Sequence, residues 1–137
     1  MKTLEGKTAI ITGASSGIGY ETAKLFAAHG ANLILNGRRL DALEALAAEI
    51  GDPNHRPVVI ASDITHEGAA QHLVETALSE FGKLDIAFNN AGIMGKTGPL
   101  VDMSAEDWRT TLDTNLTSAF FNAKHQSGFG KFGFCSI

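Results

Sequence analysis

Cysteine, long apolar runs and clustered basic residues are all scarce in this chain. Its one cysteine, Cys135, cannot form a disulfide within the chain, which fits a reducing compartment. No apolar run approaches the roughly 20 residues that a membrane-spanning helix needs, so we expect no membrane partner. The eleven basic residues are scattered apart from the pair Arg38 and Arg39, and the net charge is -4. This pattern argues against a nucleic-acid partner, because no basic stripe is available to neutralise a run of phosphates.

The N-terminal residues also lack the apolar segment of a secretory signal. Residues 1–6 read MKTLEG and include the acidic Glu5, so we expect no signal peptide and a cytoplasmic protein. The five histidines have neither metal-ligand spacing nor cysteine companions, so we expect no metal site. With 137 residues, 44% of them hydrophobic and 19% charged, the composition is that of one ordinary globular domain.

What the chain does contain is an alternation of short apolar runs with segments of helical period. We predict strands at residues 8–12, 32–36, 57–61 and 84–89, and helices at residues 17–29, 40–50 and 66–81. The strands are dense in Ile, Leu, Val and Ala without polar alternation, as in parallel strands covered on both faces. The pattern predicts an α/β fold, a Rossmann-like doubly wound parallel sheet in three α/β/α layers.

Local signals refine the ends and the buried faces of these helices. Thr65 is the expected N-cap of the third helix, and Ser104 with Asp107 predicts a capping box that opens a later helical region. Helical spacing predicts apolar stripes in the first, third and last helices: Ile18, Leu25 and Phe26; Ala70, Leu73, Ala77 and Phe81; Leu112, Leu116, Ala119, Phe120 and Ala123. The final residues interleave glycine and phenylalanine without a period, so we predict a dinucleotide-binding domain at 1–125 and an irregular tail at 126–137.

The strongest motif is TGASSGIG at residues 12–19, directly after the first strand and at the opening of the first helix. Glycines in such a turn let backbone N–H groups approach a pyrophosphate, and the helix N-terminus adds positive partial charge. Ser15 and Ser16 offer further hydroxyl donors. The alternative is a glycine-rich turn that binds nothing.

A second motif, Asn89-Asn90-Ala91-Gly92, follows the fourth strand. Alone, it is equally consistent with a simple turn. Together with the spacing TGxxxGxG, which differs from the GxGxxG dinucleotide fingerprint, it resembles the short-chain dehydrogenase/reductase family over about residues 4–125. The resemblance implies an oxidoreductase that moves hydride between a nicotinamide coenzyme and a carbonyl or alcohol substrate. A Rossmann-like methyltransferase fits less well, because its glycine pattern differs.

The resemblance also implies a set of coenzyme contacts. Asp63, which follows the third strand, matches the family's residue beside the adenine ring, although it is also placed to cap the next helix. The second strand ends without the acidic residue that would bind a ribose 2′-hydroxyl, and Arg38 offers a planar fork suited to a phosphate. We therefore expect NADP(H) in preference to NAD(H); a solvated Arg38 is the alternative. The expected contacts are Gly13, Ser15, Ser16, Gly17, Ile18, Gly19, Arg38, Asp63, Ile64, Asn90, Ala91 and Gly92.

Of the family's catalytic residues, only Asn115 has a match. It resembles the asparagine that interrupts a long helix and supports a proton-relay water, and the alternative is a polar residue on an exposed helix face. The family's downstream serine and Tyr-x-x-x-Lys pair are not found where expected. Tyr20 and Lys24 satisfy that string, but they lie far too early, in the first helix, so we interpret the match as a coincidence.

Without the family's later strands the sheet is expected to be incomplete. The chain is then either part of a longer enzyme or a shortened, inactive product. The rival interpretation is a non-catalytic dinucleotide-binding or interaction module. The resemblance also implies a homo-oligomer that pairs through the helix containing Asn115, and it leaves the substrate undefined beyond a carbonyl or an alcohol.

Overall fold

Five parallel strands form a single sheet at the centre of the molecule. The computed structural model describes residues 1–129 and 133–136. The strands are β1 (Thr8–Ile11), β2 (Asn32–Gly37), β3 (Val58–Ala61), β4 (Ile86–Asn89) and β5 (Gly133–Ser136). Their order is β3-β2-β1-β4-β5, and every neighbouring pair is parallel. The first strand of the chain is therefore the central strand of the sheet.

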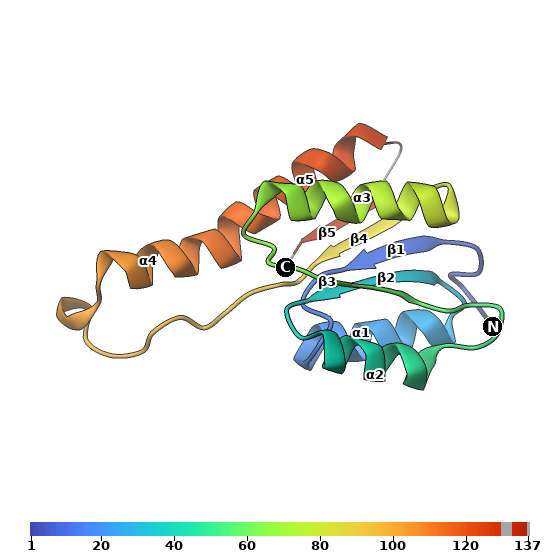
Figure 1. Ribbon diagram of the computed structural model, residues 1–137, viewed down its shortest axis with the longest axis horizontal. Coiled ribbons are helices and arrows are strands. Elements are labelled where there is room, and N and C mark those ends of the chain that lie inside the picture. The colour runs from blue at the N-terminus through green and yellow to red at the C-terminus, as the bar shows by residue number, and fades with distance from the viewer. Residues whose placement is uncertain (130–132, 137) are drawn as a thin grey trace.

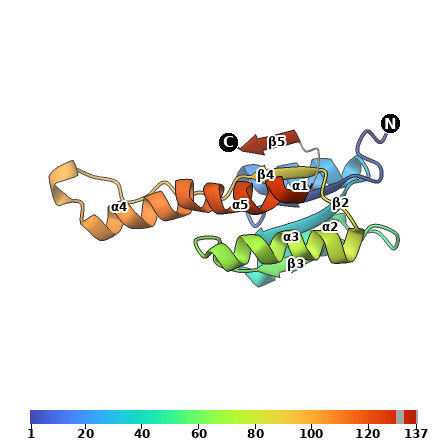
Figure 2. The same cartoon turned by 90° about the horizontal axis from the view of Figure 1, so that it is seen from above.

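Helices cover both faces of this sheet, which confirms the three-layer doubly wound fold (Figure 1). On one face lie α1 (Gly17–Ala28) and α2 (Leu40–Ile50), and on the other lie α3 (Glu67–Phe81) and α5 (Ser118–Gln126). A short π-helix, η2 (Asp113–Thr117), joins α4 (Ala105–Leu112) to α5, and 3-10 turns occupy η1 (Leu100–Asp102) and η3 (Ser127–Phe129). In Figures 1 and 2, α4 and the segment before it project beyond the sheet.

Alternate residues of the central strands belong to two separate hydrophobic clusters, one on each face of the sheet. Ile11 packs with Leu33 and Leu43 on the α1 and α2 side, whereas Ile10 packs with Ile34 and Leu73 on the α3 side. Both faces of β1 are fully buried. This double burial explains why the strand sequences show no polar alternation.

The prediction of an irregular tail is wrong for residues 133–136. They form β5, and Ala87 and Phe88 of β4 pair with Phe134 and Cys135. Glycines interrupt this segment, so its sequence lacks the apolar run that marked the other strands; the free edge of β4 supplies the pairing that local composition does not signal. The predicted boundary at residue 125 also falls inside α5, which ends at Gln126. Residues 130–132 and 137 of the predicted tail lie outside the described residues.

The predicted apolar stripe of the first helix is only partly correct. Ile18 and Leu25 are 66% and 57% exposed, and Phe26 alone of the three packs against the core. The buried positions of α1 are instead Gly19 and Ala23. Small residues let this helix lie close to the sheet, and that close approach turns the larger side chains outward.

The last helix also reverses the predicted stripe, because its polar side faces inward. Leu116 and Phe120 are 64% and 61% exposed, whereas Ser118, Asn122 and Gln126 are buried. The buried hydroxyl of Ser118 donates to the Thr114 carbonyl and the Asn122 amide donates to the Ser118 carbonyl, so helix carbonyls satisfy these donors locally. In α3, by contrast, the inward stripe is confirmed at Ala70, Leu73 and Ala77, with Phe81 partly buried.

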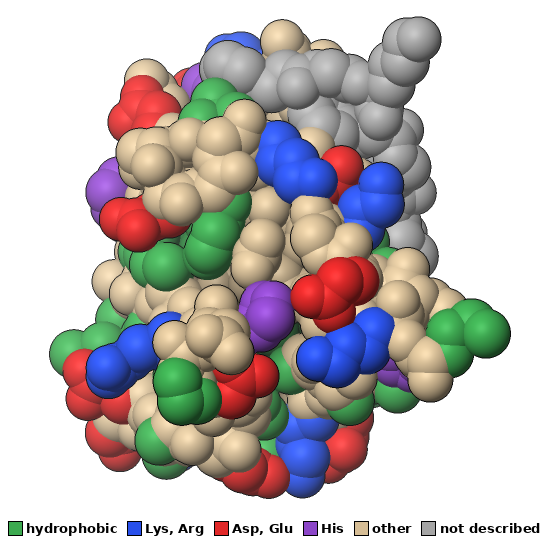
Figure 3. Space-filling model, turned by 90° about the vertical axis from the view of Figure 1, so that its right-hand side faces the viewer, with side chains coloured by type: hydrophobic (Ala, Val, Ile, Leu, Met, Phe, Trp, Pro, Cys, Tyr) green, Lys and Arg blue, Asp and Glu red, His purple; other side chains and the backbone are tan. Residues whose placement is uncertain are grey.

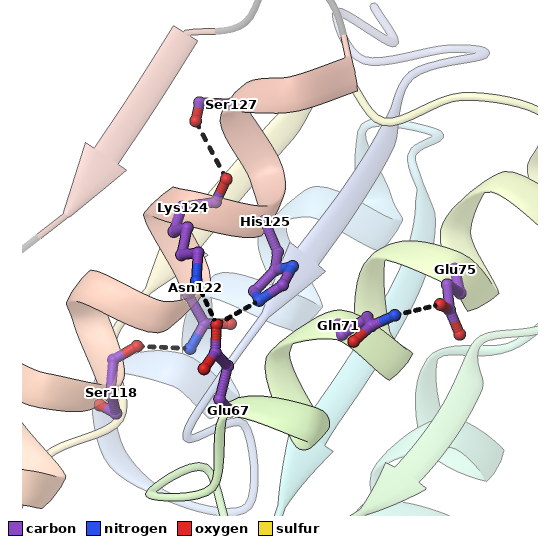
Figure 4. Close-up of polar contacts among 8 residues, drawn as sticks. All are labelled: Glu67, Gln71, Glu75, Ser118, Asn122, Lys124, His125 and Ser127. Carbon is purple, nitrogen blue, oxygen red and sulfur yellow. Dashed lines mark hydrogen bonds and ion pairs between the residues drawn. The ribbon is translucent and has the colours of Figure 1, made fainter.

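A charged cluster joins the two helices that share a face. The Glu67 carboxylate at the start of α3 accepts from the Lys124 ammonium at 2.6 Å, and the ring Nε2 of His125 lies 3.0 Å from the same oxygen (Figure 4). These hydrogen bonds, first from Lys124 and then from His125, lower the pKa of Glu67. The cluster therefore ties α3 to α5 most firmly when Glu67 is ionised.

The surface of the molecule carries both signs of charge. On the face drawn in Figure 3, Lys and Arg side chains lie interspersed with Asp and Glu side chains. Within residues 1–129 and 133–136, no helix combines the length and the apolar character needed to cross a membrane.

Candidate functional site

A cleft of about 580 Å³ opens at the carboxyl ends of β1, β2, β3 and β4. The chain moves outward from β1 to β2 and β3 and then returns to β4 on the other side of β1, so the cleft lies where the direction of winding reverses. Ligands of doubly wound sheets bind at such reversal points. The cleft brings together most of the predicted site residues: Gly13, Ser15, Ser16, Ile18, Arg38, Asp63, Ile64, Asn90, Ala91 and Gly92.

The glycine-rich turn forms the floor of this cleft. Gly13 and Gly17 have φ of +65° and +59°, a region that favours glycine. A Cβ on Gly13 would lie 3.0 Å from the Cα of Ala91, and one on Gly19 would overlap the Gly13 carbonyl oxygen. A Cβ on Gly17 would meet nothing within 4 Å. The turn is therefore packed tightly on its inner side and open on its outer side.

The N-terminus of α1 offers uncapped backbone amides. Ser16, the N-cap residue, is extended with φ of −161°, and its side chain makes no capping hydrogen bond. The first N–H groups of a helix have no partner within the helix, and they carry its positive partial charge. Together with the bare glycines, these amides fit a diphosphate group, the part of a dinucleotide that the sequence motif predicts.

Thr12 connects the two sequence motifs through hydrogen bonds. Its buried hydroxyl oxygen accepts the backbone N–H groups of Asn90 at 3.0 Å and Ala91 at 3.1 Å. The Asn90 side-chain amide also donates to the Thr12 carbonyl at 3.3 Å. The sequence predicts no separate role for Thr12, although its place at the head of the glycine motif is a signal for one. It fixes the end of β4 against the end of β1.

The cleft wall beyond β3 is organised by an acidic residue. The Asp63 Oδ1 atom accepts from the backbone and the hydroxyl of Thr65, at 3.0 and 2.7 Å. These bonds lower the pKa of Asp63, and the nearby charges of His66 and Arg38 lower it further. Asp63 therefore forms a local turn instead of capping α3. The prediction of Thr65 as N-cap is also wrong, because α3 begins at Glu67 after His66.

Several further residues line the cleft for which the sequence predicts no role in the site. They are Asn36, Gly37, Ser62, Thr65, Ile93, Thr110, Asp113 and Thr114. Asn36 and Gly37 directly precede Arg38 at the end of β2, where the sequence analysis considered only the missing acid and the arginine. Thr110 comes from α4, and Asp113 and Thr114 come from η2, and no local pattern indicates that these two elements reach the cleft.

Asn115 lies in η2, at the interruption between α4 and α5. Its side chain makes two hydrogen bonds with the backbone of Ile93, in the loop after β4. The Ile93 N–H donates to Oδ1 at 2.7 Å, and Nδ2 donates to the Ile93 carbonyl at 2.8 Å. A π-helix commonly marks a functional segment. Gly17, Gly19 and Asn115 are the three predicted residues that do not line the cleft itself.

Tyr20 does not line this cleft either. Its hydroxyl donates to the Glu49 carboxylate on α2, and the Lys24 ammonium lies 2.8 Å from the same carboxylate. The hydrogen bond to Glu49 raises the pKa of Tyr20. A general base needs the opposite shift, toward neutrality. The Tyr20 and Lys24 pair therefore joins two helices and is poorly suited to proton transfer.

Comparisons with known proteins agree with this geometry. A family model described as short chain dehydrogenase matches residues 7–127. Tropinone reductase-like 2 from Erythroxylum coca is 41% identical over 127 residues, covering 90% of this chain and 45% of that protein. Serine 3-dehydrogenase from Agrobacterium fabrum is 44% identical over 110 residues, covering 80% of this chain and 43% of that protein. The chain thus spans about half the length of the curated relatives it matches.

Solved structures show the same fold. A short-chain dehydrogenase/reductase from Brucella melitensis, described as a glucose/ribitol dehydrogenase, superposes with a TM-score of 0.90 at 33% identity, over 99% of this chain and 58% of that one. A 3-ketoacyl-(acyl-carrier-protein) reductase from Brucella melitensis, complexed with NADH, superposes with a TM-score of 0.82 at 38% identity. The match covers 89% of this chain and 49% of that one. With its glycine turn, its reversal-point cleft and these matches, the chain belongs to the short chain dehydrogenase family.

Proposed function

We propose that this chain binds NADP(H) in the cleft and forms the coenzyme-binding part of an oxidoreductase acting on a carbonyl or alcohol carbon. The observation that carries the proposal is the uncapped amide end of α1 beside a cleft that Gly13, Ser15, Ser16 and Ile18 of the glycine-rich turn line. The coenzyme supplies the hydride chemistry when bound. The residues of this chain hold its diphosphate and align it over β1 and β4.

Charge at the end of β2 supports NADP(H) over NAD(H). A carboxylate at this position would accept hydrogen bonds from a ribose 2′-hydroxyl and repel a 2′-phosphate. Here the strand ends in Asn36 and Gly37, and the exposed Arg38 lines the cleft. A guanidinium group binds phosphate through two parallel N–H donors.

Fluorescence titration of the chain with NADPH and NADH tests the proposal. Arg38→Ala is expected to weaken NADPH binding about tenfold or more, the loss of a hydrogen bond to a charged group. It is expected to leave NADH binding within about twofold. Arg39→Ala is the matched control, because Arg39 is also exposed but does not line the cleft. Equal affinity of the unaltered chain for both coenzymes would contradict the preference, and binding of neither would contradict the proposal as a whole.

A second candidate is a dinucleotide-binding module without turnover. It is favoured by one observation: the only tyrosine of the chain, Tyr20, is held by Glu49 and lies outside the cleft lining. Incubating the chain with NADPH and a panel of aldehydes and ketones separates the two. Binding without oxidation of NADPH supports the module, whereas oxidation that depends on an added carbonyl compound rules it out.

For the protein partner we propose a second copy of the chain. The outward face of η2 and α5 exposes Leu116 and Phe120, and a matching face would cover them. Phe120→Glu is expected to shift the protein from dimer to monomer in sedimentation velocity, because two carboxylates would face each other across the contact. A monomer before the substitution, or an unchanged dimer after it, would contradict this proposal.

A further inference from the structure

A buried amide at the end of β2 orients a hydroxyl in the cleft wall. Asn36 is 1% exposed, and its Nδ2 donates to the Ile60 carbonyl at 3.1 Å and to the Ser62 hydroxyl oxygen at 2.9 Å. A carbonyl oxygen only accepts, so the contact with Ile60 fixes which atom of the Asn36 amide is the nitrogen. Asn36 is therefore a donor toward Ser62.

The Ser62 hydroxyl is consequently left with a proton to give. Its oxygen accepts from Asn36, and within the part of the chain that the structure describes its own proton has no acceptor. The backbone N–H of Ser62 donates to the Gly37 carbonyl at 3.0 Å, which holds the residue beside the end of β2. Ser62 is only partly buried and lines the cleft. The hydroxyl proton of Ser62 is thus available to a ligand in the cleft.

The surroundings of this hydroxyl are rich in donors. Ser15 and Arg38 line the same cleft, and a Cβ on Gly37 would lie 3.2 Å from the Ser15 hydroxyl oxygen, so the bare glycine lets that hydroxyl lie close to the end of β2. Two carboxylates, Asp63 and Asp113, also line the cleft, and the Oδ1 atom of Asp63 already accepts twice from Thr65. Hydroxyl and guanidinium donors that line one cleft fit a phosphate better than a neutral ribose hydroxyl.

We infer that Ser62, positioned by Asn36, is a second determinant of coenzyme choice, donating its hydroxyl proton to the adenosine 2′-phosphate beside Arg38. This inference rests on the proposed NADP(H) function. It assigns discrimination to a residue on the β3 side of the cleft, in addition to the arginine on the β2 side. Asn36 acts through Ser62, so its role is positioning.

Two fragments isolate the 2′-phosphate: adenosine 2′,5′-bisphosphate and adenosine 5′-monophosphate, titrated by calorimetry into the chain. Ser62→Ala is expected to weaken the bisphosphate about tenfold and the monophosphate less than about twofold. Ser62→Thr keeps the hydroxyl and is expected to retain the preference. Ser79→Ala, the same change on an exposed part of α3, is the matched control and is expected to change neither affinity.

Asn36→Asp tests the orientation of the hydroxyl. A carboxylate only accepts, so Ser62 would donate to residue 36 and present a lone pair to the cleft. The ratio of the two affinities is then expected to fall at least as far as in Ser62→Ala. Thermal melting by circular dichroism shows whether Asn36→Asp is folded. If it is not, the test rests on Ser62→Ala alone.

The outcomes separate this inference from the proposed function. If the unaltered chain prefers the bisphosphate but Ser62→Ala weakens both fragments equally, or neither, the role of Ser62 is wrong while NADP(H) binding stands. If the unaltered chain binds neither fragment, both ideas are overturned. A selective loss in Ser62→Ala that Ser62→Thr reverses supports the inference.

Discussion

Asn89 at the end of β4 and Gln126 at the end of α5 form a closed pair, in which each side-chain amide donates to the carbonyl oxygen of the other at 2.9 Å. Both side chains are buried, at 5% and 1% exposure. The pair satisfies polar groups that would be costly to bury alone. It also fixes where α5 rests on the sheet, and thereby where η2 meets the loop after β4.

Breaking this pair on one side is expected to destabilise the fold. Gln126→Leu keeps the side-chain size but leaves the Asn89 amide buried without a partner, which costs about 1–3 kcal/mol. Urea unfolding measures the change. Replacing both residues by leucine removes the orphaned group, so the double variant is expected to recover most of the loss. A single variant as stable as the unaltered chain would contradict the pair's importance.

The glycine turn gives a prediction about packing. In Gly19→Ala the added methyl group would overlap the Gly13 carbonyl, so the turn has to open. We expect a stability loss of about 1–3 kcal/mol, as for overpacked sites, together with at least tenfold weaker NADPH binding. Gly68→Ala in α3 is the matched control. A Cβ there meets nothing within 4 Å, so alanine is expected to stabilise the helix by up to about 1 kcal/mol. Unchanged NADPH binding in Gly19→Ala would count against the role of the turn.

The cluster around Glu67 predicts a pH dependence of stability. The folded pKa of Glu67 is lowered from its ordinary value of 4.5, so its contribution is fully present above about pH 4.5 and is lost as the pH falls through the folded pKa. We expect Glu67→Gln to lower the urea midpoint at pH 7, and the gap to the unaltered chain to close in acid. Glu75→Gln, which removes a charge but keeps an oxygen that can accept from the neutral Gln71, serves as the control on the same helix. A gap that persists below the folded pKa would exclude ionisation of Glu67 as its cause.

The sequence predicts most of the sheet because β1 and nearly all of β2 and β4 are buried, and these strands read as continuous apolar runs. For β1, β2, β3 and β4 the apolar runs place every strand within two residues of its observed ends. β5 was missed because its pairing depends on the edge of β4 and not on its own composition. Non-local pairing of this kind leaves little trace in a short window of sequence.

In the helices and the cleft, too, local sequence patterns are predicted and contacts between distant residues are not. The glycine and NNAG motifs predict cleft residues that lie next to one another in the chain. The contact between Asn36 and Ser62 joins the end of β2 to the residue that follows β3, and it has no local signature. In α5 the apolar period is real, but the sheet side is occupied by Ser118 and Asn122, so the period marks the exposed face. Tertiary contacts decide which side of an amphipathic helix is buried.

The central place of β1 has a consequence during synthesis. One edge of β1 can pair with β2 once α1 and β2 have left the ribosome, but the other edge pairs only with β4, which follows two further helices. Until then its backbone N–H and C=O groups are free to pair with a strand from another nascent chain. A pause in translation between Gly37 and Ile86 would thus prolong the time for which this edge of β1 is unpaired.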